Sequence, residues 1–295
     1  VIGDPDYMVA NNFTLEGKAI ADPDGADYFD EYDALAVTVA DGNLTIEGGD
    51  DETPLCFLEV VEASRGFSKV LIPTPDPMQR AFPGAEGQAK FMSGGRYGDV
   101  YHVTNLNWSG PGSLAWGFQT AYGDYPRTIV FDVSGHIAPP DSADADGEML
   151  LVGNNITVAG QSAPGRGITI RDHTVKIQNG SNLILRYLRF RLGDQNKGNS
   201  SGADCVTAEN NDGLMMDHLS MSWSIDGIMD SRSNGRFTVQ WSIFAEPLHD
   251  SIHYEGGPHG YLMSFRDLNA PLSVHHNLFS SGSTRHPTLG SAALS

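Results

Sequence analysis

The sequence predicts an all-β protein whose larger part is a β-solenoid, a coil of short stacked strands. Five apolar segments recur beyond residue 155, and their first positions are separated by 27, 31, 23 and 35 residues. These segments begin at Ile156, Leu183, Leu214, Phe237 and Leu272. A long period of this kind is typical of a solenoid, because one rung cannot bury its own apolar face and must stack on the next. A β-sandwich, the rival interpretation, would instead show hairpins about every 8–12 residues.

A second apolar position repeats in the last four segments. Phe190, Met221, Phe244 and Phe279 each come five residues after the third residue of their segment. Longer insertions follow these positions, at residues 191–204, 222–230, 246–260 and 280–287. Equivalent positions of successive rungs stack roughly 4.8 Å apart. We therefore expect the insertions to lie on one side of the solenoid, where residues far apart in sequence meet.

The first part of the solenoid region, residues 81–155, predicts strands separated by glycine turns. Apolar, β-prone segments at 100–106 and 127–133 are flanked by Gly-rich stretches. A helix is expected only around residues 114–122.

Residues 1–64 predict a small, acidic, β-rich domain. The turn sequence Ala-Asp-Gly-Asn at 40–43 lies between β-prone segments at 32–39 and 44–46, which indicates a hairpin, and a last strand is expected at 56–61. This pattern weakly resembles the C-terminal hairpins of malectin-like or galactose-binding β-sandwich domains, and the start at Val1 suggests a partial one. The acid-rich stretch 22–33 is either a calcium loop or a solvated acidic face. Residues 65–80 contain three spaced prolines and predict an extended linker.

The charge distribution limits the partners. The net charge is −19, and residues 1–70 hold 16 Asp and Glu against 3 Lys and Arg, which gives −13 and leaves −6 for the rest. A strongly acidic surface argues against nucleic acid. It would also repel an anionic polysaccharide, unless the binding site supplies its own cations.

No apolar run approaches the roughly 18 residues of a membrane span. Cys56 and Cys205 fall in different predicted domains and are expected to be buried thiols rather than a disulfide.

The stretch 222–230 concentrates the candidate chemistry. It places Asp226 and Asp230 four residues apart, with Asp204 one repeat upstream and an isolated Arg285 two repeats downstream. Several carboxylates at one place are costly unless a cation neutralises them, and Ca²⁺ takes oxygen ligands. We therefore expect these four side chains to meet on one face of the solenoid, around a metal ion. The alternatives are turn-forming aspartates, or aspartates that contact substrate without a metal.

Residues 81–295 resemble the pectate lyase family of right-handed parallel β-helices. The resemblance is carried, in this order, by the motifs at 81–87 (AFPGAEG), 101–106 (YHVTNL), 110–114 (GPGSL), 186–191 (RYLRFR), 216–220 (MDHLS), 226–230 (DGIMD), 259–261 (HGY), 275–277 (HHN) and 285–287 (RHP). The family consists of secreted lyases that cleave polygalacturonate by calcium-assisted β-elimination. The resemblance therefore implies a secreted, extracellular enzyme that uses Ca²⁺ and an acidic polysaccharide. We expect a monomer.

The resemblance also implies roles for individual residues. Asp204, Asp226 and Asp230 match the calcium carboxylates of the family, and Arg285 matches the base of its Arg-x-Pro motif. Arginine is an awkward base because a guanidinium loses its proton only above about pH 12. A nearby calcium ion and desolvation would ease that loss, so an alkaline optimum is implied. The alternative for Arg285 is a non-catalytic role, as an ion-pairing or surface arginine.

The expected substrate-binding residues depart from the family pattern. Relatives carry His-x-Lys-Gly before the His-Gly-Tyr motif, whereas this chain has Glu255 near the place of the lysine. We expect His253, His259 and Arg266 to contact the substrate instead. A second arginine that follows the Arg-x-Pro motif in the family is Gly290 here. These departures point to altered substrate or lost activity.

Several other interpretations accompany the resemblance. The Asp217-His218 pair is expected to be mainly structural, in a hydrogen-bonded ladder beside the site. Arg186, Arg189 and Arg191 are expected to alternate on one strand face. The alternatives to a lyase are a non-catalytic glycan-binding solenoid and a β-helical glycoside hydrolase, which would need two carboxylates about 5–9.5 Å apart. Because Ser295 follows Arg285 so closely, we expect a chain truncated at its C-terminus.

Overall fold

The structure is a computed structural model that divides the chain into two compact units, Val1–Leu71 and Ile72–Ser295. It describes residues 12–15, 18–21, 46–48, 76–121, 123–140, 148–195, 202–267 and 270–290.

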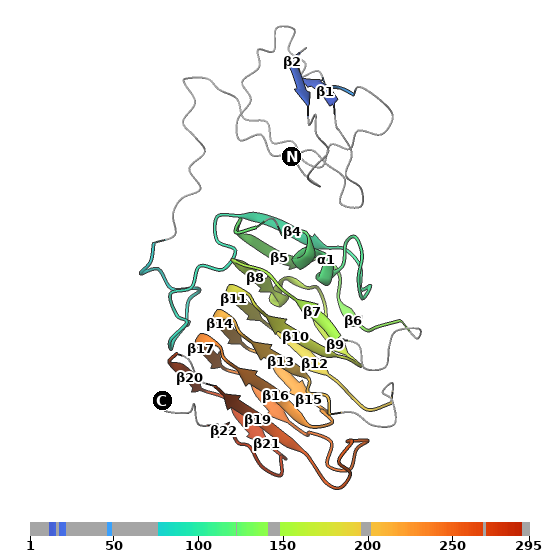
Figure 1. Cartoon of the computed structure of the whole chain (residues 1–295), viewed down its shortest axis with the longest axis vertical. Helices are drawn as coiled ribbons and strands as arrows, with labels where there is room; N and C mark the ends of the chain where they lie inside the picture. Colours follow the sequence, from blue (N-terminus) through green and yellow to red (C-terminus); the bar gives the residue numbers. More distant parts are fainter. Residues whose placement is uncertain are drawn as a thin grey trace. The chain divides into compact units, whose positions relative to one another are not determined.

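The first unit contains a three-stranded antiparallel sheet in the described residues (Figure 1). Its central strand β1 (Asn12–Leu15) pairs with β2 (Lys18–Ala21) on one side and with β3 (Ile46–Gly48) on the other. The strands expected at 32–39 and 56–61, the acid-rich stretch 22–33 and Cys56 lie outside the described residues.

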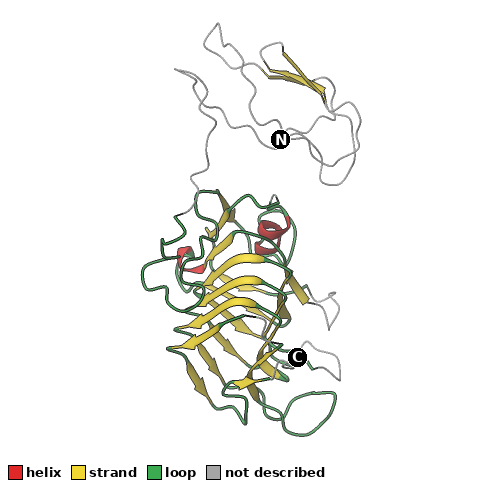
Figure 2. Cartoon of the chain, turned by 60° about the vertical axis from the view of Figure 1, so that its left-hand side comes forward, coloured by secondary structure: helices red, strands yellow, loops and turns green. Residues whose placement is uncertain are grey.

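The second unit is a parallel β-helix built from three parallel sheets (Figures 1 and 2). The chain visits sheet 1, sheet 2 and sheet 3 in turn and then repeats. Sheet 1 contains β4 (Asp99–Val103), β5 (Arg127–Phe131), β8 (Ile156–Ala159), β11 (Ser181–Arg186), β14 (Asp212–Asp217), β17 (Gly235–Gln240) and β20 (Leu272–His275). Sheet 2 contains β6 (Gly135–Ile137), β9 (Ile168–Arg171), β12 (Leu188–Arg191), β15 (Ser220–Ser222), β18 (Ile243–Ala245) and β21 (Leu278–Ser280). Sheet 3 contains β7 (Glu148–Leu151), β10 (Thr174–Gln178), β13 (Val206–Glu209), β16 (Gly227–Arg232), β19 (Tyr261–Arg266) and β22 (Thr288–Leu289).

The strand register confirms the repeat expected from the sequence. In sheet 1, Leu183 pairs with Leu214, which pairs with Phe237, which pairs with Leu272. In sheet 2, the second repeated position stacks in the same way, in the order Phe190, Met221, Phe244 and Phe279. The predicted fold class, an all-β right-handed parallel β-helix, is therefore confirmed.

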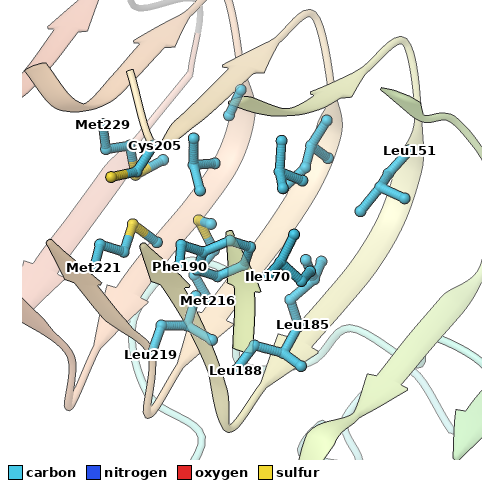
Figure 3. Close-up of a cluster of buried hydrophobic side chains, with 14 of the residues drawn as sticks. Leu151, Ile170, Leu185, Leu188, Phe190, Cys205, Met216, Leu219, Met221 and Met229 are labelled. Atoms are coloured by element: carbon cyan, nitrogen blue, oxygen red, sulfur yellow. The ribbon is translucent and has the colours of Figure 1, made fainter. Parts of the chain in front are cut away.

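The core runs along the inside of the β-helix. Figure 3 shows side chains from all three sheets converging there, among them Leu185 and Met216 from sheet 1, Phe190 from sheet 2 and Met229 from sheet 3. Each of these side chains is at most 1% exposed. Because each rung presents its apolar side chains inward, burial is shared between successive rungs, and a one-residue slip of register would expose the whole set.

A short helix precedes the regular coils. Helix α1 (Leu114–Gln119) begins after Ser113, whose side chain accepts a hydrogen bond from the Trp116 amide at 3.1 Å. This N-cap satisfies one of the free amides of the first turn. Leu114 and Phe118 are buried, so the helix packs onto the coil, as the sequence predicted for this segment.

The longer loops of the last coils all lie at one corner. They connect sheet 2 to sheet 3, between β12 and β13, β15 and β16, β18 and β19, and β21 and β22. This arrangement confirms that the insertions share one side of the solenoid.

The corner between sheets 1 and 2 is instead sharp. One residue per rung there adopts a left-handed conformation, namely Tyr187, His218, Trp241 and His276, with φ of 57°, 53°, 51° and 54°. Their rings stack on one another, with centroid distances of 4.6, 6.3 and 4.3 Å. The corner therefore carries a ladder of aromatic rings along the solenoid.

Next to these rings lies a polar ladder around a buried carboxylate. Asp217 is 0% exposed and accepts hydrogen bonds from Arg186 at 2.8 Å and from Gln240 at 2.7 Å. This supports the structural interpretation of Asp217-His218, but the ladder lies at the corner between sheets 1 and 2. The expectation that three arginines share one strand face is wrong, because Arg186 ends β11 whereas Arg189 and Arg191 lie in β12.

Candidate active site

The predicted site residues gather where sheet 2 passes into sheet 3. Asp204 lies shortly before β13, Asp226 directly precedes β16, Asp230 lies within β16, and Arg285 lies shortly before β22. Successive strands of sheet 3 are in register, so Gly227 pairs with Tyr261 and Asp230 pairs with Ser264. The repeat therefore brings residues separated by up to about 80 positions to the same edge of sheet 3, on successive rungs from β13 to β22.

The first two aspartates form a strongly anionic centre. Asp204 accepts a hydrogen bond from the Gly227 amide at 2.8 Å. Burial, followed by the charges of Asp226 and Asp230, raises the pKa of the Asp204 carboxyl well above its ordinary value, and the Gly227 hydrogen bond and Arg285 only partly oppose this. The fold thus holds carboxylates together at an electrostatic cost, which a cation would remove.

One oxygen of Asp226 is left without a hydrogen bond. Its Oδ1 atom is buried and has no hydrogen-bond partner among the described residues. The nearest cation is Arg285, whose Nη1 lies 3.9 Å away, within ion-pair range but too far for a hydrogen bond. A buried, unsatisfied carboxylate oxygen is unusual in a folded protein and is a suitable ligand for a hard cation.

Asp230 differs from the other two carboxylates because it is already neutralised. Arg266 holds it through both carboxylate oxygens, with an Nε to Oδ1 distance of 3.1 Å, and the Ser264 hydroxyl donates to the same Oδ1. Burial lowers the pKa of Arg266, but the hydrogen bond and charge of Asp230 outweigh this effect and raise it. Arg266, expected as a substrate contact, is therefore engaged within the site, and a metal would have to share Asp230 with it.

Arg285 is positioned by a ring and a backbone pairing. Its guanidinium lies over the Tyr261 ring, 4.0 Å from the centroid, and its carbonyl accepts a hydrogen bond from the Met263 amide at 2.8 Å. The side chain is 32% exposed, so the group is held in place yet open to a ligand. Tyr261 belongs to the predicted His-Gly-Tyr motif but had no assigned role. Its register with Gly227, one residue after Asp226, is the signal that places it in the site.

The two histidines of the 246–260 loop lie beside Asp226. His253 and His259 are 6% and 5% exposed, and their rings stack with centroids 3.5 Å apart. One ligand atom from each, together with one carboxylate oxygen of Asp226, lies within 4.8 Å of the others. Burial and the neighbouring His259 lower the pKa of His253, while Asp226 and Glu255 partly oppose this.

Among the described residues, two groups of side chains are close enough to share a metal ion, and neither is the predicted set of three aspartates. In the described part of the chain, two groups of three ligand atoms come within 4.8 Å of one another, namely Asp226 with His253 and His259, and Glu86 with His275 and His276. The set of three aspartates is not such a group. The carboxylates of Asp204 and Asp226 fit a calcium ion by their chemistry and by their unrelieved charge, whereas Asp230 is committed to Arg266.

Comparisons with known proteins identify relatives of this chain. No family model matches the chain. Over 208 residues, which are 70% of this chain, it is 37% identical to a protein of Emericella nidulans named probable pectate lyase C and 36% identical to one of Aspergillus fumigatus with the same name. The chain covers 44% of the length of each of these relatives.

A solved structure gives a partial match. The crystal structure of Jun a 1, the major allergen of cedar pollen, superposes with a TM-score of 0.44 and 19% sequence identity, covering 54% of this chain and 49% of that one. The resemblance expected from the motifs is confirmed by the sequence comparison, and the chain is a homologue of proteins named as pectate lyases.

Proposed function

We propose that the β-helical unit is a polysaccharide lyase that cleaves polygalacturonate, or a related uronate polymer, by β-elimination. The observation that carries the proposal is the position of Arg285, held over Tyr261 and 3.9 Å from an unsatisfied oxygen of Asp226. Two relatives that share more than a third of their aligned residues with this chain carry the name pectate lyase, which supports the same activity. We also propose that the protein is secreted, as the family resemblance implies. Among the described residues, no helix is long and apolar enough to cross a membrane.

The reaction needs a base beside the anionic centre. In β-elimination, the proton at C5 of the uronate leaves as the bond from C4 to the glycosidic oxygen breaks, and a C4–C5 double bond forms. Arg285 is our candidate acceptor for that proton, because its side chain is partly exposed beside Asp226. It can take the C5 proton only in its neutral form, after the guanidinium has itself lost a proton. Tyr261 restricts the orientation of its guanidinium through the ring contact.

Calcium is the cofactor that the carboxylates favour. We propose that Asp204 and Asp226 hold it, with Asp230 contributing alongside Arg266. When bound, Ca²⁺ would draw charge from the uronate carboxylate and so make the C5 proton easier to remove. The same ion would relieve the repulsion that raises the pKa of Asp204. Without such an ion, an acidic polymer would meet uncompensated negative charge at this corner.

Substrate positioning is assigned to the 246–260 loop. His253 and His259 lie next to Asp226 and belong to the connection between β18 and β19. Glu255, which stands near the place of the lysine of relatives, contacts Nε2 of His259 at 3.7 Å and adds negative charge there. We therefore propose that His253 and His259 take over substrate recognition. Arg266 would contribute only through the part of its guanidinium that stays exposed while it pairs with Asp230.

The test measures product and metal dependence together. The full chain is incubated with polygalacturonate, with either calcium or a chelator, and the ultraviolet absorbance of the unsaturated uronate is followed. We expect absorbance only with calcium, and we expect Arg285→Lys to lower the rate by about 10²–10⁴-fold, as loss of a positioned base does.

The matched control is Arg232→Lys. Arg232 ends β16, and its side chain makes a long, exposed ion pair with Asp267 at 3.8 Å, so its replacement should leave the rate unchanged. Equal rates in chelator would refute the calcium-dependent route. New reducing ends without absorbance would instead identify a hydrolase, and binding without any cleavage would identify a non-catalytic glycan-binding protein.

A further inference from the structure

A second cluster of metal-binding side chains lies away from the candidate active site. It consists of Glu86, His275 and His276, and one ligand atom of each lies within 4.8 Å of the others. His275 ends β20 and His276 occupies the sharp corner between sheets 1 and 2, whereas the candidate active site lies between sheets 2 and 3. This cluster is therefore independent of the proposed lyase chemistry.

The corner conformation is what brings two consecutive histidines together. Neighbouring side chains of a strand point to opposite faces. His276 leaves the strand conformation with a φ of 54°, and its ring turns back so that its Nδ1 lies 2.8 Å from Nδ1 of His275. At tetrahedral zinc with Zn–N bonds of about 2.05 Å, two nitrogens would lie about 3.3 Å apart. A small rotation of one ring would therefore give a ligand spacing suited to a metal.

Neighbouring contacts hold the three ligands near these positions. The His276 ring stacks on Trp241 with centroids 4.3 Å apart and planes 10° from parallel. The Glu86 amide donates to the buried Gln240 side chain at 3.0 Å, which fixes the backbone that carries the carboxylate. Nε2 of His275 is buried and has no hydrogen-bond partner among the described residues. The ring of His275 thus has one unsatisfied nitrogen, Nε2, while its other nitrogen, Nδ1, faces His276.

Glu86 belongs to a segment that crosses the rungs of sheet 1. Its amides donate to one rung after another: Gln88 to Ser273, Ala89 to Thr238, Gly94 to Asn182 and Gly95 to Thr157, at 2.9–3.2 Å. Figure 1 shows this teal segment beside β14, β17 and β20. A metal held by Glu86, His275 and His276 would join this segment to β20, closing a loop of nearly 190 residues.

We propose that Glu86, His275 and His276 form a binding site for a divalent transition metal, represented by Zn²⁺, that fastens the 81–95 segment to the end of sheet 1. Imidazole together with one carboxylate favours zinc, copper or nickel over calcium, which prefers oxygen ligands alone. The expected role is stabilising, because an ion that binds only the folded unit raises its unfolding temperature.

The test uses the full chain after treatment with a chelator. The test is carried out on the double variant His253→Gln/His259→Gln, called the background, which removes the histidines beside Asp226 that could also bind zinc. Zn²⁺ is titrated calorimetrically, and Ni²⁺ quenching of tryptophan fluorescence locates the site, because Trp241 stacks directly on His276. We expect one saturable zinc site and quenching that Trp241→Phe reduces.

The variants separate loss of a ligand from loss of the fold. Glu86→Gln keeps the shape of the side chain, and His276→Phe keeps an aromatic ring on Trp241. Each should weaken zinc binding at least about tenfold and abolish the zinc-dependent rise in unfolding temperature, while far-ultraviolet circular dichroism stays unchanged. The control His102→Phe removes an exposed histidine paired with Asp132 and should bind zinc like the background. Equal zinc affinity in background and variants, or no binding below millimolar zinc, would overturn the proposal.

Discussion

The buried asparagine Asn234 offers a direct test of what holds the coils together. It lies at the corner from sheet 3 to sheet 1 and is 4% exposed. Its Oδ1 accepts hydrogen bonds from both the backbone amide and the side-chain Nδ2 of Asn211, at 3.0 and 2.8 Å, and its own Nδ2 donates to the Ala208 carbonyl at 2.8 Å. The same Nδ2 also donates to the Ser231 hydroxyl at 2.9 Å, so the substitution Asn234→Ala would remove four hydrogen bonds.

The expected loss in the free energy of unfolding follows from the hydrogen-bond donors that would be left unpaired. Asn211 is itself 2% exposed, so water cannot readily replace the lost acceptor. Each buried donor without a partner costs about 1–3 kcal/mol, and two such donors on Asn211 give about 2–6 kcal/mol. That loss is a large share of the stability of a typical domain, which is about 5–15 kcal/mol.

Urea unfolding followed by tryptophan fluorescence measures the effect. The four tryptophans, Trp108, Trp116, Trp223 and Trp241, all lie in the second unit, so the signal reports the β-helix alone. With a slope of about 3 kcal/mol per M, the midpoint should fall by about 0.7–2 M.

The matched control is a more exposed asparagine at the same corner. Asn154 bonds to Asp124 at 2.9 Å and to the Ser181 hydroxyl at 2.9 Å near the surface. Its replacement by alanine should cost less than about 1 kcal/mol, since water can take over both bonds. If the two variants shifted the midpoint equally, the argument that unpaired buried amides determine the cost would be refuted.

Three further predictions concern a carboxylate, a thiol and a ring. Burial and the charges of Asp226 and Asp230 raise the pKa of Asp204 in the folded protein. Chelated protein should therefore lose stability as the pH rises above about 3.9, the ordinary aspartate value. Asp204→Asn should reduce this loss in thermal melts from pH 4 to 7, and an unchanged dependence of the unfolding temperature on pH would contradict the assignment. Cys205 is 1% exposed and burial raises its pKa to about 12; iodoacetamide should label it only after denaturation, as seen by peptide mass spectrometry, and rapid labelling of native protein would disprove its inert character. Phe244 is fully buried and stacks on Phe279 with ring centroids 5.2 Å apart. Its replacement by alanine should lower the free energy of unfolding, measured in urea, by about 3–5 kcal/mol. A loss below about 1 kcal/mol would show that the coil closes over the cavity.

The sequence was most informative where burial repeats. The apolar positions of the five segments predicted the register of sheet 1, and the second repeated position predicted the stacking of Phe190, Met221, Phe244 and Phe279 in sheet 2. Such positions can be read from sequence because a register slip would expose every apolar side chain of a rung at once. The same repeat predicted that the insertions meet at one corner and that Asp204, Asp226 and Arg285 approach one another there.

The partners of the polar side chains could not be predicted in the same way. The engagement of Asp230 by Arg266 was not expected, and the sequence gives no sign of it because the two residues lie 36 positions apart on paired strands. The pairing of His253 and His259 beside Asp226 depends on the path of a 15-residue connection between β18 and β19. Connections of this length carry no periodic pattern from which side-chain directions follow.

The sequence by itself thus determined the solenoid, its repeat and the corner at which charged residues collect, since these follow from the periodic burial of apolar side chains. Only the tertiary structure decided which charges pair. It committed Asp230 to Arg266 and left Asp226 with an unsatisfied oxygen near Arg285. It also brought ligand atoms of Glu86, His275 and His276 within 4.8 Å of one another, although Glu86 lies nearly 190 residues away in sequence. The physical reason is that apolar burial depends on which face a residue occupies, whereas ion pairs and metal ligands depend on side-chain directions to within about an ångström.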